Sequence, residues 1–260
     1  MKSLLLAFAI MVGAAAALAA VLLYKGVLRL NYPGLAEFPV QGVDVSHHQG
    51  VVNWPSLKGP SVQFAYIKAT EGADFQDSNF ASNWVGAQSA GIRPGAYHFF
   101  TLCKPGVEQA RNFLASMAAV HGPSLPPAVD LEFGGNCAAR PSKAEFAAEL
   151  KSFVDTVRAG TGCPVVLYLT PDFHASYLEG EAIDEALWVR DIYLRPHLPG
   201  RGNWTIWQYA NRGRLPGVEN FIDLNVFRGS AADFERFRCE HAQPQAPVAF
   251  KPAGVQGATR

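Results

Sequence analysis

Two acidic side chains stand two positions apart in segment 128–133, which directly follows a pair of prolines. Proline ends a helix and favours extended backbone, so the segment is predicted to be a short strand. Side chains alternate along a strand, so Asp130 and Glu132 share one face, with backbone positions about 6.6 Å apart at roughly 3.3 Å per residue. In a confined site two such carboxyl groups do not keep ordinary pKa values, and one tends to stay protonated. That pair suits glycosidic bond hydrolysis, although a lone Asp-x-Glu is more often a solvated strand edge.

Further acidic and aromatic side chains lie near the ends of other predicted strands. Asp44 and Asp223 are two of them. In a barrel of parallel strands, chemistry collects at the C-terminal strand ends, so we expect all four acids at one mouth. Aromatic rings with polar tips suit sugar rings, although such rings can equally fill the barrel core. The candidate substrate-binding aromatics are Tyr97, Tyr168, Trp188, Trp207 and Tyr209.

Other polar residues near strand ends have less specific interpretations. Lys68 and Glu71 flank a strand end, where they could hydrogen-bond a substrate or form a surface ion pair. His47, His48 and His98 could suggest a metal site, but adjacent histidines on a strand point to opposite faces and do not easily share one ion. We therefore expect neither a metal ion nor another cofactor.

The apolar periodicity predicts the elements that position these residues. The clearest helix is 142–159, where Ser142 and Glu145 form a capping box and Gly160 ends the helix. Strands and helices alternate up to residue 169, which implies parallel strands with right-handed crossovers, whereas the last strands lack strong helical segments between them. The fold class is therefore α/β, a modified TIM-type barrel of five β/α units followed by three strands. The predicted strands are 41–46, 64–69, 95–100, 128–133, 165–169, 187–189, 205–209 and 222–226.

Length and composition indicate the class of protein and the kind of partner that it binds. The chain has 260 residues, about half of them apolar, which is enough for one large core. Its 22 basic and 22 acidic residues give no net charge that would attract nucleic acid. An uncharged polymer such as a glycan suits this balance, and we expect a monomer.

An uncharged apolar run occupies residues 3–24, between Lys2 and Lys25. It is long enough to span a bilayer, while the small residues at 14–20 could supply a signal-peptide cleavage site. Residues 1–26 are therefore predicted to be a signal peptide or an N-terminal membrane anchor, and the continuation of the apolar run through 21–24 favours the anchor. Either alternative exports the body to the cell envelope or outside the cell, and we expect membrane contact only through this segment. The remaining divisions are a linker at 27–40, a catalytic barrel at 41–240 and a disordered tail at 241–260.

Four cysteines fit an oxidising compartment and allow three connectivities. Cys103 and Cys137 each lie just beyond a predicted strand end, whereas Cys163 precedes a strand and Cys239 lies near the last helix. We therefore predict disulfides between Cys103 and Cys137 and between Cys163 and Cys239. The cysteine spacing does not favour a zinc site.

Six segments in order resemble family 25 of the glycoside hydrolases, the CH-type lysozymes or N-acetylmuramidases. The resemblance covers roughly residues 42–229 and implies the modified barrel described above. It also implies cleavage of the bond between N-acetylmuramic acid and N-acetylglucosamine, with peptidoglycan glycan strands as the partner. The segments are GVDVSHHQG (42–50), IKATEG (67–72), GAYHF (95–99), DLE (130–132), WQY (207–209) and IDLN (222–225).

The same resemblance implies individual roles. Glu132 would be the general acid. Asp130 would orient the substrate's N-acetyl group for attack on its own anomeric carbon, or help to hold the water. Asp44 and Asp223 would be supporting acids, with Tyr97 as an active-site donor. Gln208, in the fifth motif, joins the substrate-binding candidates.

One segment departs from the family. The family pattern on the sixth strand is Trp-x-Ala-x-Tyr, whereas here Trp188 is followed by Arg190 and then by Tyr193, one position late. Two alternative functions stay open from the sequence: a non-catalytic peptidoglycan-binding module, and a chitin-type glycan hydrolase on the same fold. The four acids argue against a pure binder, because clustered negative charge adds little to glycan binding.

Overall fold

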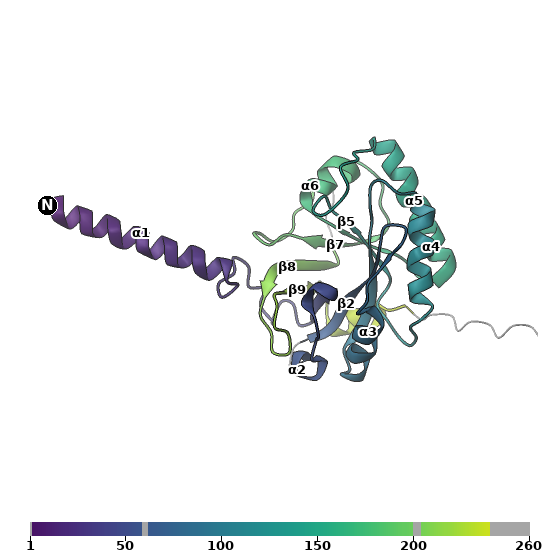
Figure 1. The fold of residues 1–260 in the computed structure, drawn as a ribbon, viewed down its shortest axis with the longest axis horizontal. Helices are drawn as coiled ribbons and strands as arrows, with labels where there is room; N and C mark the ends of the chain where they lie inside the picture. The colour runs from purple at the N-terminus through teal and green to yellow at the C-terminus, as the bar shows by residue number, and fades with distance from the viewer. Residues whose placement is uncertain (1, 59–61, 200–203, 240–260) are drawn as a thin grey trace, which may run out of the picture.

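Eight strands close into a barrel (Figure 1). The computed structural model describes residues 2–58, 62–199 and 204–239. The order around the barrel is β1, β2, β4, β5, β6, β7, β8 and β9, with β9 pairing back to β1; a two-residue strand, β3 (Phe75–Gln76), adds to the edge of β2. The barrel strands are β1 (Gln41–Val45), β2 (Val62–Glu71), β4 (Arg93–Phe99), β5 (Ala128–Leu131), β6 (Val166–Leu169), β7 (Ala186–Arg190), β8 (Ile206–Gly213) and β9 (Ile222–Phe227).

Strand direction decides which residues share a rim. From β1 through β8 the neighbouring barrel strands are parallel, whereas β9 runs antiparallel to both β8 and β1. The start of β9 therefore lies at the same rim as the C-terminal ends of the other barrel strands. This arrangement confirms the predicted barrel, with its helices concentrated in the first part of the chain.

Helices cover the outside of the early strands. α4 (Gly106–Met117) and α5 (Lys143–Thr161) lie side by side in Figure 1. A Cβ at Gly106 would come within 1.9 Å of the Glu149 carbonyl oxygen, so glycine is needed at this close approach. The remaining helical segments are η1 (His47–Gln49), α2 (Trp54–Lys58), α3 (Phe80–Ser89), α6 (Pro171–Phe173), η2 (His174–Leu178) and α7 (Ala231–Arg236).

The ends of α5 test the sequence prediction directly. The Ser142 hydroxyl accepts from the Glu145 backbone N–H and the Glu145 side chain accepts in return, which confirms the capping box. The predicted end at Gly160 is wrong, because α5 continues to Thr161 and stops at Gly162. Gly162 has a φ of 71°, in the left-handed region that glycine adopts at low cost.

Apolar side chains form two cores. The larger lies between the strands and the surrounding helices and includes Phe113, Phe146 and Phe153. The smaller fills the barrel interior and includes Tyr66 and Trp188, both almost fully buried. These side chains fill the interior of the barrel, so the barrel is a packed core and not an open channel.

Both predicted disulfides are present. Cys103 is bonded to Cys137 and Cys163 to Cys239, across 34 and 76 residues of sequence. The first joins the segment after β4 to the loop after β5. The second joins the turn after α5 to the end of the described chain, and Cys239 also pairs with Ser124 through backbone hydrogen bonds.

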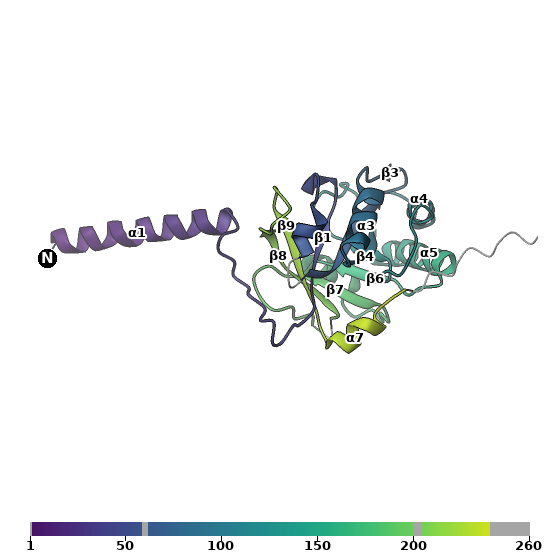
Figure 2. The ribbon, with the colours of Figure 1, turned by 90° about the horizontal axis from the view of Figure 1, so that it is seen from below.

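The N-terminal helix α1 (Lys2–Tyr24) extends away from the barrel with no buried residue (Figures 1 and 2). It is long and apolar enough to cross a membrane. Its end is attached to the barrel: Arg212 Nη1 donates to the Tyr24 carbonyl at 2.7 Å, and Arg214 Nε donates to the Lys25 carbonyl at 2.8 Å. The predicted disordered tail at 241–260 lies outside the described residues.

Candidate active site

The four predicted acids line one cavity of about 290 Å³ at the rim formed by the C-terminal strand ends. The acids arrive from β1, from the end of β5 and from the start of β9. The four acids therefore converge on one cavity, as the sequence predicted. The lining residues are Asp44, Tyr97, Asp130, Glu132, Tyr168, Trp188, Arg190, Gln208, Asn211 and Asp223.

Asp130 is the deeper member of the Asp-x-Glu pair. It is only 8% exposed, and among the described residues its buried Oδ1 has no hydrogen-bond partner. Burial, followed by the negative charge of Glu132, raises the pKa of Asp130 well above its ordinary value. An unpartnered carboxyl oxygen on a cavity wall is placed to bind a donor from a ligand.

Glu132 lies one residue beyond β5 and faces Arg190. Arg190 Nη1 donates to Glu132 Oε2 at 3.2 Å. Burial raises the pKa of Glu132, while the Arg190 charge and hydrogen bond oppose that rise. The net direction is upward, which favours a protonated acid at higher pH than for a free glutamate.

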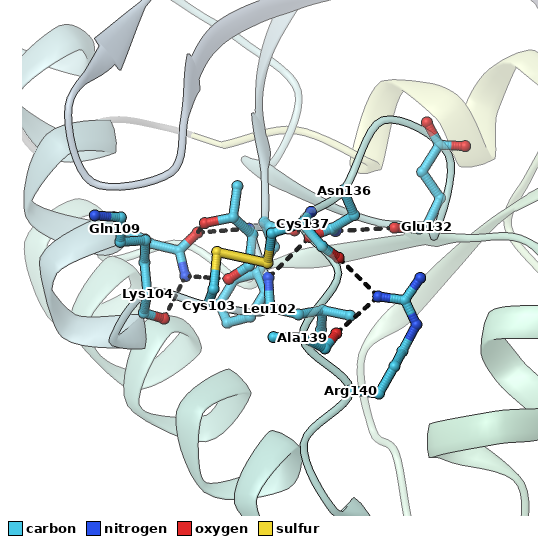
Figure 3. The surroundings of a disulfide bond; sticks show 11 residues. Leu102, Cys103, Lys104, Gln109, Glu132, Asn136, Cys137, Ala139 and Arg140 are labelled. Atoms are coloured by element: carbon cyan, nitrogen blue, oxygen red, sulfur yellow. Dashed lines mark hydrogen bonds between the residues drawn. A yellow bond between two sulfur atoms is a disulfide. The ribbon is translucent and has the colours of Figure 1, made fainter.

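Hydrogen bonds and a disulfide hold the loop that follows Glu132 (Figure 3). Asn136 Nδ2 donates to the Glu132 carbonyl at 3.0 Å and to the Phe100 carbonyl at 2.8 Å, and Asn136 Oδ1 accepts from the Leu102 backbone at 2.9 Å. The next residue is Cys137, one end of the first disulfide. The backbone that carries Glu132 is therefore tied to the segment after β4.

Asp44 and Asp223 face each other across the β1–β9 pairing. Asp44 Oδ2 accepts from Asn225 Nδ2 at 2.7 Å and from Gln208 Nε2 at 2.8 Å. Burial raises the pKa of Asp44 and these hydrogen bonds oppose the rise. The pKa of Asp223 is raised well above its ordinary value by burial and by the charge of Asp44.

Three of the predicted aromatics belong to the cavity. Trp188 lies in the inner core with its ring stacked on Tyr66 at 4.6 Å, and Tyr168 meets it edge-on at 4.7 Å. Tyr168 donates to Gln208 Oε1 at 3.0 Å. Burial and the nearby acids raise the pKa of Tyr97 well above its ordinary value, so its hydroxyl remains a neutral donor.

The other two aromatics do not reach this cavity. Trp207 alternates with the inward Gln208 on β8 and packs against Phe38 and Trp204, with its indole N–H on the Asp191 carbonyl at 2.8 Å. Tyr209 lines a neighbouring cavity beside the end of α1. Strand alternation places both side chains on the opposite face from Gln208, which the sequence prediction grouped with them.

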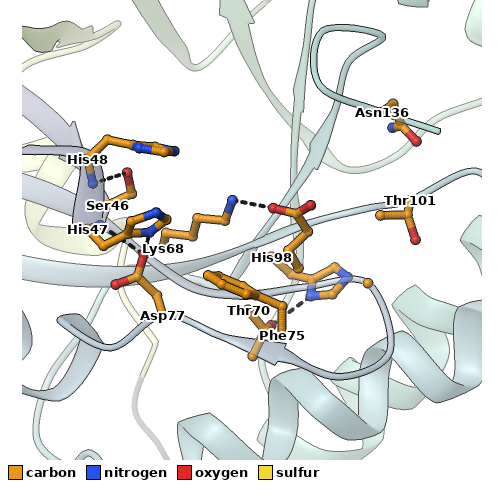
Figure 4. A network of polar contacts seen from close by, with 12 residues as sticks. Ser46, His47, His48, Lys68, Thr70, Phe75, Asp77, His98, Thr101 and Asn136 are labelled. Carbon is orange, nitrogen blue, oxygen red and sulfur yellow. Dashed lines mark hydrogen bonds and ion pairs between the residues drawn. The ribbon is translucent and has the colours of Figure 1, made fainter.

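Lys68 and Glu71 pair with each other, and Figure 4 shows Lys68 in this polar network. Lys68 Nζ lies 2.7 Å from Glu71 Oε2, so the ion-pair interpretation describes the geometry. The Lys68 side chain is 9% exposed, however, so this is not a simple surface pair. Neither residue lines the acidic cavity.

The histidines lie apart from the acids. His47 and His48 belong to the short helix η1 and not to a strand, and the His47 ring contacts Asp77 at 2.8 Å. His98 is buried between Thr70 and Gln109, at 2.7 and 3.1 Å. Within the described ranges, no group of three or more His, Cys, Asp or Glu side chains is placed to hold a metal ion.

Two cavity residues, Arg190 and Asn211, and one residue that hydrogen-bonds Asp44, Asn225, were missing from the sequence candidates. Asn225 stood in a matched motif, and its alternation with Asp223 could have indicated a role on the same face. Arg190 was noted only as a departure from the family pattern, although its spacing from Trp188 places both on one face. Asn211 carried no signal, because an irregular pairing of β8 with β9 determines where it points.

A closed barrel with buried paired carboxyl groups at the carboxyl-terminal rim defines a glycoside hydrolase type of site. The family model for glycosyl hydrolases family 25 matches residues 43–218. The chain therefore belongs to glycosyl hydrolases family 25, and it is a glycoside hydrolase.

Individual relatives agree with this assignment. Lysozyme M1 of Streptomyces globisporus is 37% identical over 204 residues, which cover 74% of this chain and 69% of the relative. An N,O-diacetylmuramidase of Chalaropsis sp is 32% identical, covering 72% and 95%. Among solved structures, a family 25 glycosyl hydrolase from Bacillus anthracis aligns with a TM-score of 0.73 and 33% identity, covering 81% and 97%.

Proposed function

We propose that this protein is an exported muramidase that hydrolyses the β-1,4 bond between N-acetylmuramic acid and N-acetylglucosamine in peptidoglycan. Family membership and relatives named as lysozyme and N,O-diacetylmuramidase support the substrate. The observation that carries the mechanism is the shared cavity of Asp130 and Glu132, whose pKa values are both raised by burial.

Glu132 is the proton donor in this proposal. Its proton passes to the bridging oxygen as the bond from that oxygen to the anomeric carbon breaks, and the N-acetylglucosamine end leaves as an alcohol. The resulting carboxylate then takes a proton from the water that completes hydrolysis. A raised pKa suits both steps, because the group must hold a proton in the free enzyme and recover one afterwards.

Asp130 assists beside it. The partnerless Oδ1 is available for the N–H of the substrate's N-acetyl group. Held there, the acetyl carbonyl oxygen attacks its own anomeric carbon, and water later opens the ring so formed. This route retains the anomeric configuration, so NMR of the first product tests it; an inverted product would assign Asp130 to holding water.

Asp44, Asp223 and Tyr97 complete the wall around the reacting sugar. Positive charge develops on the sugar ring as the bond breaks, and the ionised members of this acid cluster stabilise it. A module that only binds glycan would have no use for this charge. The site geometry therefore favours hydrolysis over the binding alternative.

The test replaces Glu132 by Gln, which cannot supply the proton. Release of reducing ends from purified peptidoglycan is expected to fall about 10² to 10⁴-fold while the melting temperature is kept. Glu108→Gln, an exposed glutamate on α4, is the matched control and should retain activity. Near-normal turnover by Glu132→Gln would refute its role as proton donor. Faster release of reducing ends by the wild-type enzyme from chitin oligomers than from peptidoglycan would identify chitin as the substrate.

We also propose that residues 1–26 remain as a membrane anchor. The apolar helix and the two disulfides fit export. The hydrogen bonds from Arg212 and Arg214 to the end of α1 support retention, because they hold the last turn against the barrel. Membrane-fraction protein whose N-terminal sequence begins at or near Met1 is expected; a soluble product starting near residue 21 would identify a signal peptide.

A further inference from the structure

Arg190 occupies a junction between cavities. It ends β7 and lines the acidic cavity, a second cavity of about 410 Å³ beside Phe133 and Asp172, and a third of about 400 Å³ beside Tyr24. Its side chain is 31% exposed, so the guanidinium is accessible from the rim. A ligand in the acidic cavity therefore meets a fixed positive charge at its edge.

The guanidinium has more hydrogen-bonding capacity than Glu132 uses. The contact between them is a single bond, from Nη1 to Oε2 at 3.2 Å. An arginine side chain presents five N–H donors in a planar fork that matches carboxylates bidentately. Tyr168 is a second hydrogen-bond partner of the guanidinium, and the N–H groups left over can take an anion without displacing Glu132.

Pairing with Glu132 alone does not account for this arginine. A positive charge beside a general acid favours the ionised form, and Arg190 opposes the rise of the Glu132 pKa that burial causes. Arg190 likewise opposes the rise of the pKa values of Asp44, Asp130 and Asp223, so its charge acts on the whole acidic cluster while its side chain stays partly exposed at the rim. The natural partner is a negative charge on the substrate.

The proposed substrate offers such a charge at one kind of sugar. N-acetylglucosamine is uncharged, whereas muramic acid carries a lactyl ether whose carboxyl group is an amide when a stem peptide is attached. Hydrolysis of that amide adds water, releases the peptide as an amine and leaves a free carboxylate on the sugar. Only glycan without stem peptides then presents an anion directly on the ring substituent.

We propose that Arg190 binds the free lactyl carboxylate of muramic acid, so that the enzyme prefers glycan strands from which the stem peptides have been removed. This inference rests on the proposed muramidase function. The reaction class that must supply the substrate is hydrolysis of the amide between the lactyl group and the first amino acid. The carboxylate also shares the Arg190 charge and so lets Glu132 hold its proton more tightly in the complex.

The test measures kcat/KM on three muramyl glycans of matched length. One is stripped of stem peptides and has free lactyl carboxylates, one is the same glycan with those carboxylates converted to methylamides, and one keeps its stem peptides. The enzymes are wild type, Arg190→Ala, and Arg190→Lys, which keeps the charge but not the fork. Arg195→Ala is the control, because Arg195 is an exposed arginine paired with Glu37 outside the cavity.

Wild type is expected to prefer the free carboxylate over the methylamide by about 10- to 100-fold, the range for hydrogen bonds to charged groups. Arg190→Ala should bring that ratio close to one, Arg190→Lys should leave an intermediate ratio, and Arg195→Ala should leave it unchanged. A ratio near one in wild type, or a full ratio kept in Arg190→Ala, overturns the inference.

The remaining outcomes are equally decisive. If Arg190→Ala loses activity mainly on the peptide-bearing glycan, the anion is a stem-peptide carboxylate and the lactyl assignment is wrong. An equal loss on all three glycans assigns Arg190 to positioning Glu132 only. A wild-type enzyme inactive on every muramyl glycan would instead refute the proposed function, and this inference with it.

Discussion

The side-chain amide of Asn136 donates to the main-chain carbonyl of Glu132 at 3.0 Å, immediately before a disulfide-bonded cysteine. The candidate proton donor thus depends on a loop whose shape is set by the bond from Cys137 to Cys103. Glu132 lies beyond the end of β5, so the sheet itself does not hold its backbone. The disulfide at Cys137 and the hydrogen bond from Asn136 restrain the Glu132 backbone where strand pairing has ended.

Removal of this disulfide tests the dependence. Cys103→Ala with Cys137→Ala should lower kcat by about tenfold and cost about 2 to 4 kcal/mol of unfolding free energy, because the loop gains freedom in both states. Chemical denaturation and initial rates on peptidoglycan measure the two effects. The expected loss of kcat reflects a displaced proton donor.

The second disulfide is the matched control. Cys163 and Cys239 close a longer loop of 76 residues, so their joint replacement by Ala should destabilise the fold at least as much. Neither residue lines the acidic cavity, and kcat of the folded fraction should therefore stay near the wild-type value. Equal losses of kcat in both double variants would show that bracing at Cys137 has no special role.

The pH profile should respond to Arg190. Glu132 faces Arg190 together with the acids Asp44, Asp130 and Asp172, and removal of the only cation among these groups disfavours its ionised form. The pKa of Glu132 then rises, so Arg190→Ala should keep the acid protonated to higher pH. The alkaline limb of kcat is expected to move upward in pH.

The measurement is kcat against pH at saturating substrate, for wild type and Arg190→Ala. Arg195→Ala serves as the control, since its guanidinium pairs with Glu37 outside the cavity. An alkaline limb that stays in place, or moves to lower pH, would mean that Glu132 does not set it. The proton donor would then have to be sought among the other buried acids.

Periodicity predicted the parts of the site that depend on strand alternation. Asp44, Asp130 and Asp223 meet because each points inward at the same rim, and alternation plus a closed barrel is enough to infer this. Trp207 and Tyr209 were expected at the mouth because of their aromatic character. The alternation around Gln208 places them on the outer face of β8 instead.

The alternation of side chains along strands does not predict contacts made by loops and β-bulges. The pairing of β8 with β9 shifts register twice, so the direction of Asn211 cannot be counted from Gln208. The hydrogen bond from Asn136 to Glu132 arises in the turn just before the disulfide-bonded Cys137. The spacing of Arg190 from Trp188 predicts that both side chains lie on the inner face of β7. The contact of Arg190 with Glu132 also depends on the conformation of the loop after β5, which the spacing does not predict.

Asn225 connects two parts of the site. Its Nδ2 donates to Asp44 Oδ2 at 2.7 Å, while its Oδ1 accepts from the Trp188 indole at 2.8 Å, and the residue is fully buried. Asn225→Ala leaves a buried indole N–H without its partner and removes a hydrogen bond that lowers the pKa of Asp44. We expect a loss of about 3 kcal/mol in unfolding free energy, with reduced activity.

Urea unfolding and peptidoglycan turnover measure these losses. Asn220→Ala provides the comparison, because the Asn220 amide makes one exposed hydrogen bond, to the His48 carbonyl. It should change the unfolding free energy by less than about 0.5 kcal/mol. If Asn225→Ala were as stable as Asn220→Ala, the contacts of Asn225 would not contribute to holding the cavity wall.

His98 should make the fold sensitive to acid. Burial lowers its pKa to about 3, and the ring stacks on Phe153 while bridging Thr70 and Gln109. An unfolded histidine titrates at about 6.5, so between these values the unfolded chain binds more protons. The contribution of His98 is therefore complete above pH 6.5 and falls as the pH decreases, by about 3 kcal/mol at pH 4.

His98→Gln isolates this contribution, because Gln can still bond to Thr70 and Gln109 but does not titrate. Its unfolding free energy should fall less steeply from pH 6.5 to pH 4 than that of wild type, measured by urea unfolding at each pH. Asp130 and Asp223, whose pKa values are raised, act in the opposite direction and are unchanged in the comparison. His121→Gln, at an exposed position, should keep the wild-type slope. Equal slopes for His98→Gln and wild type would show that His98 is not the group that acid titrates as the fold is lost.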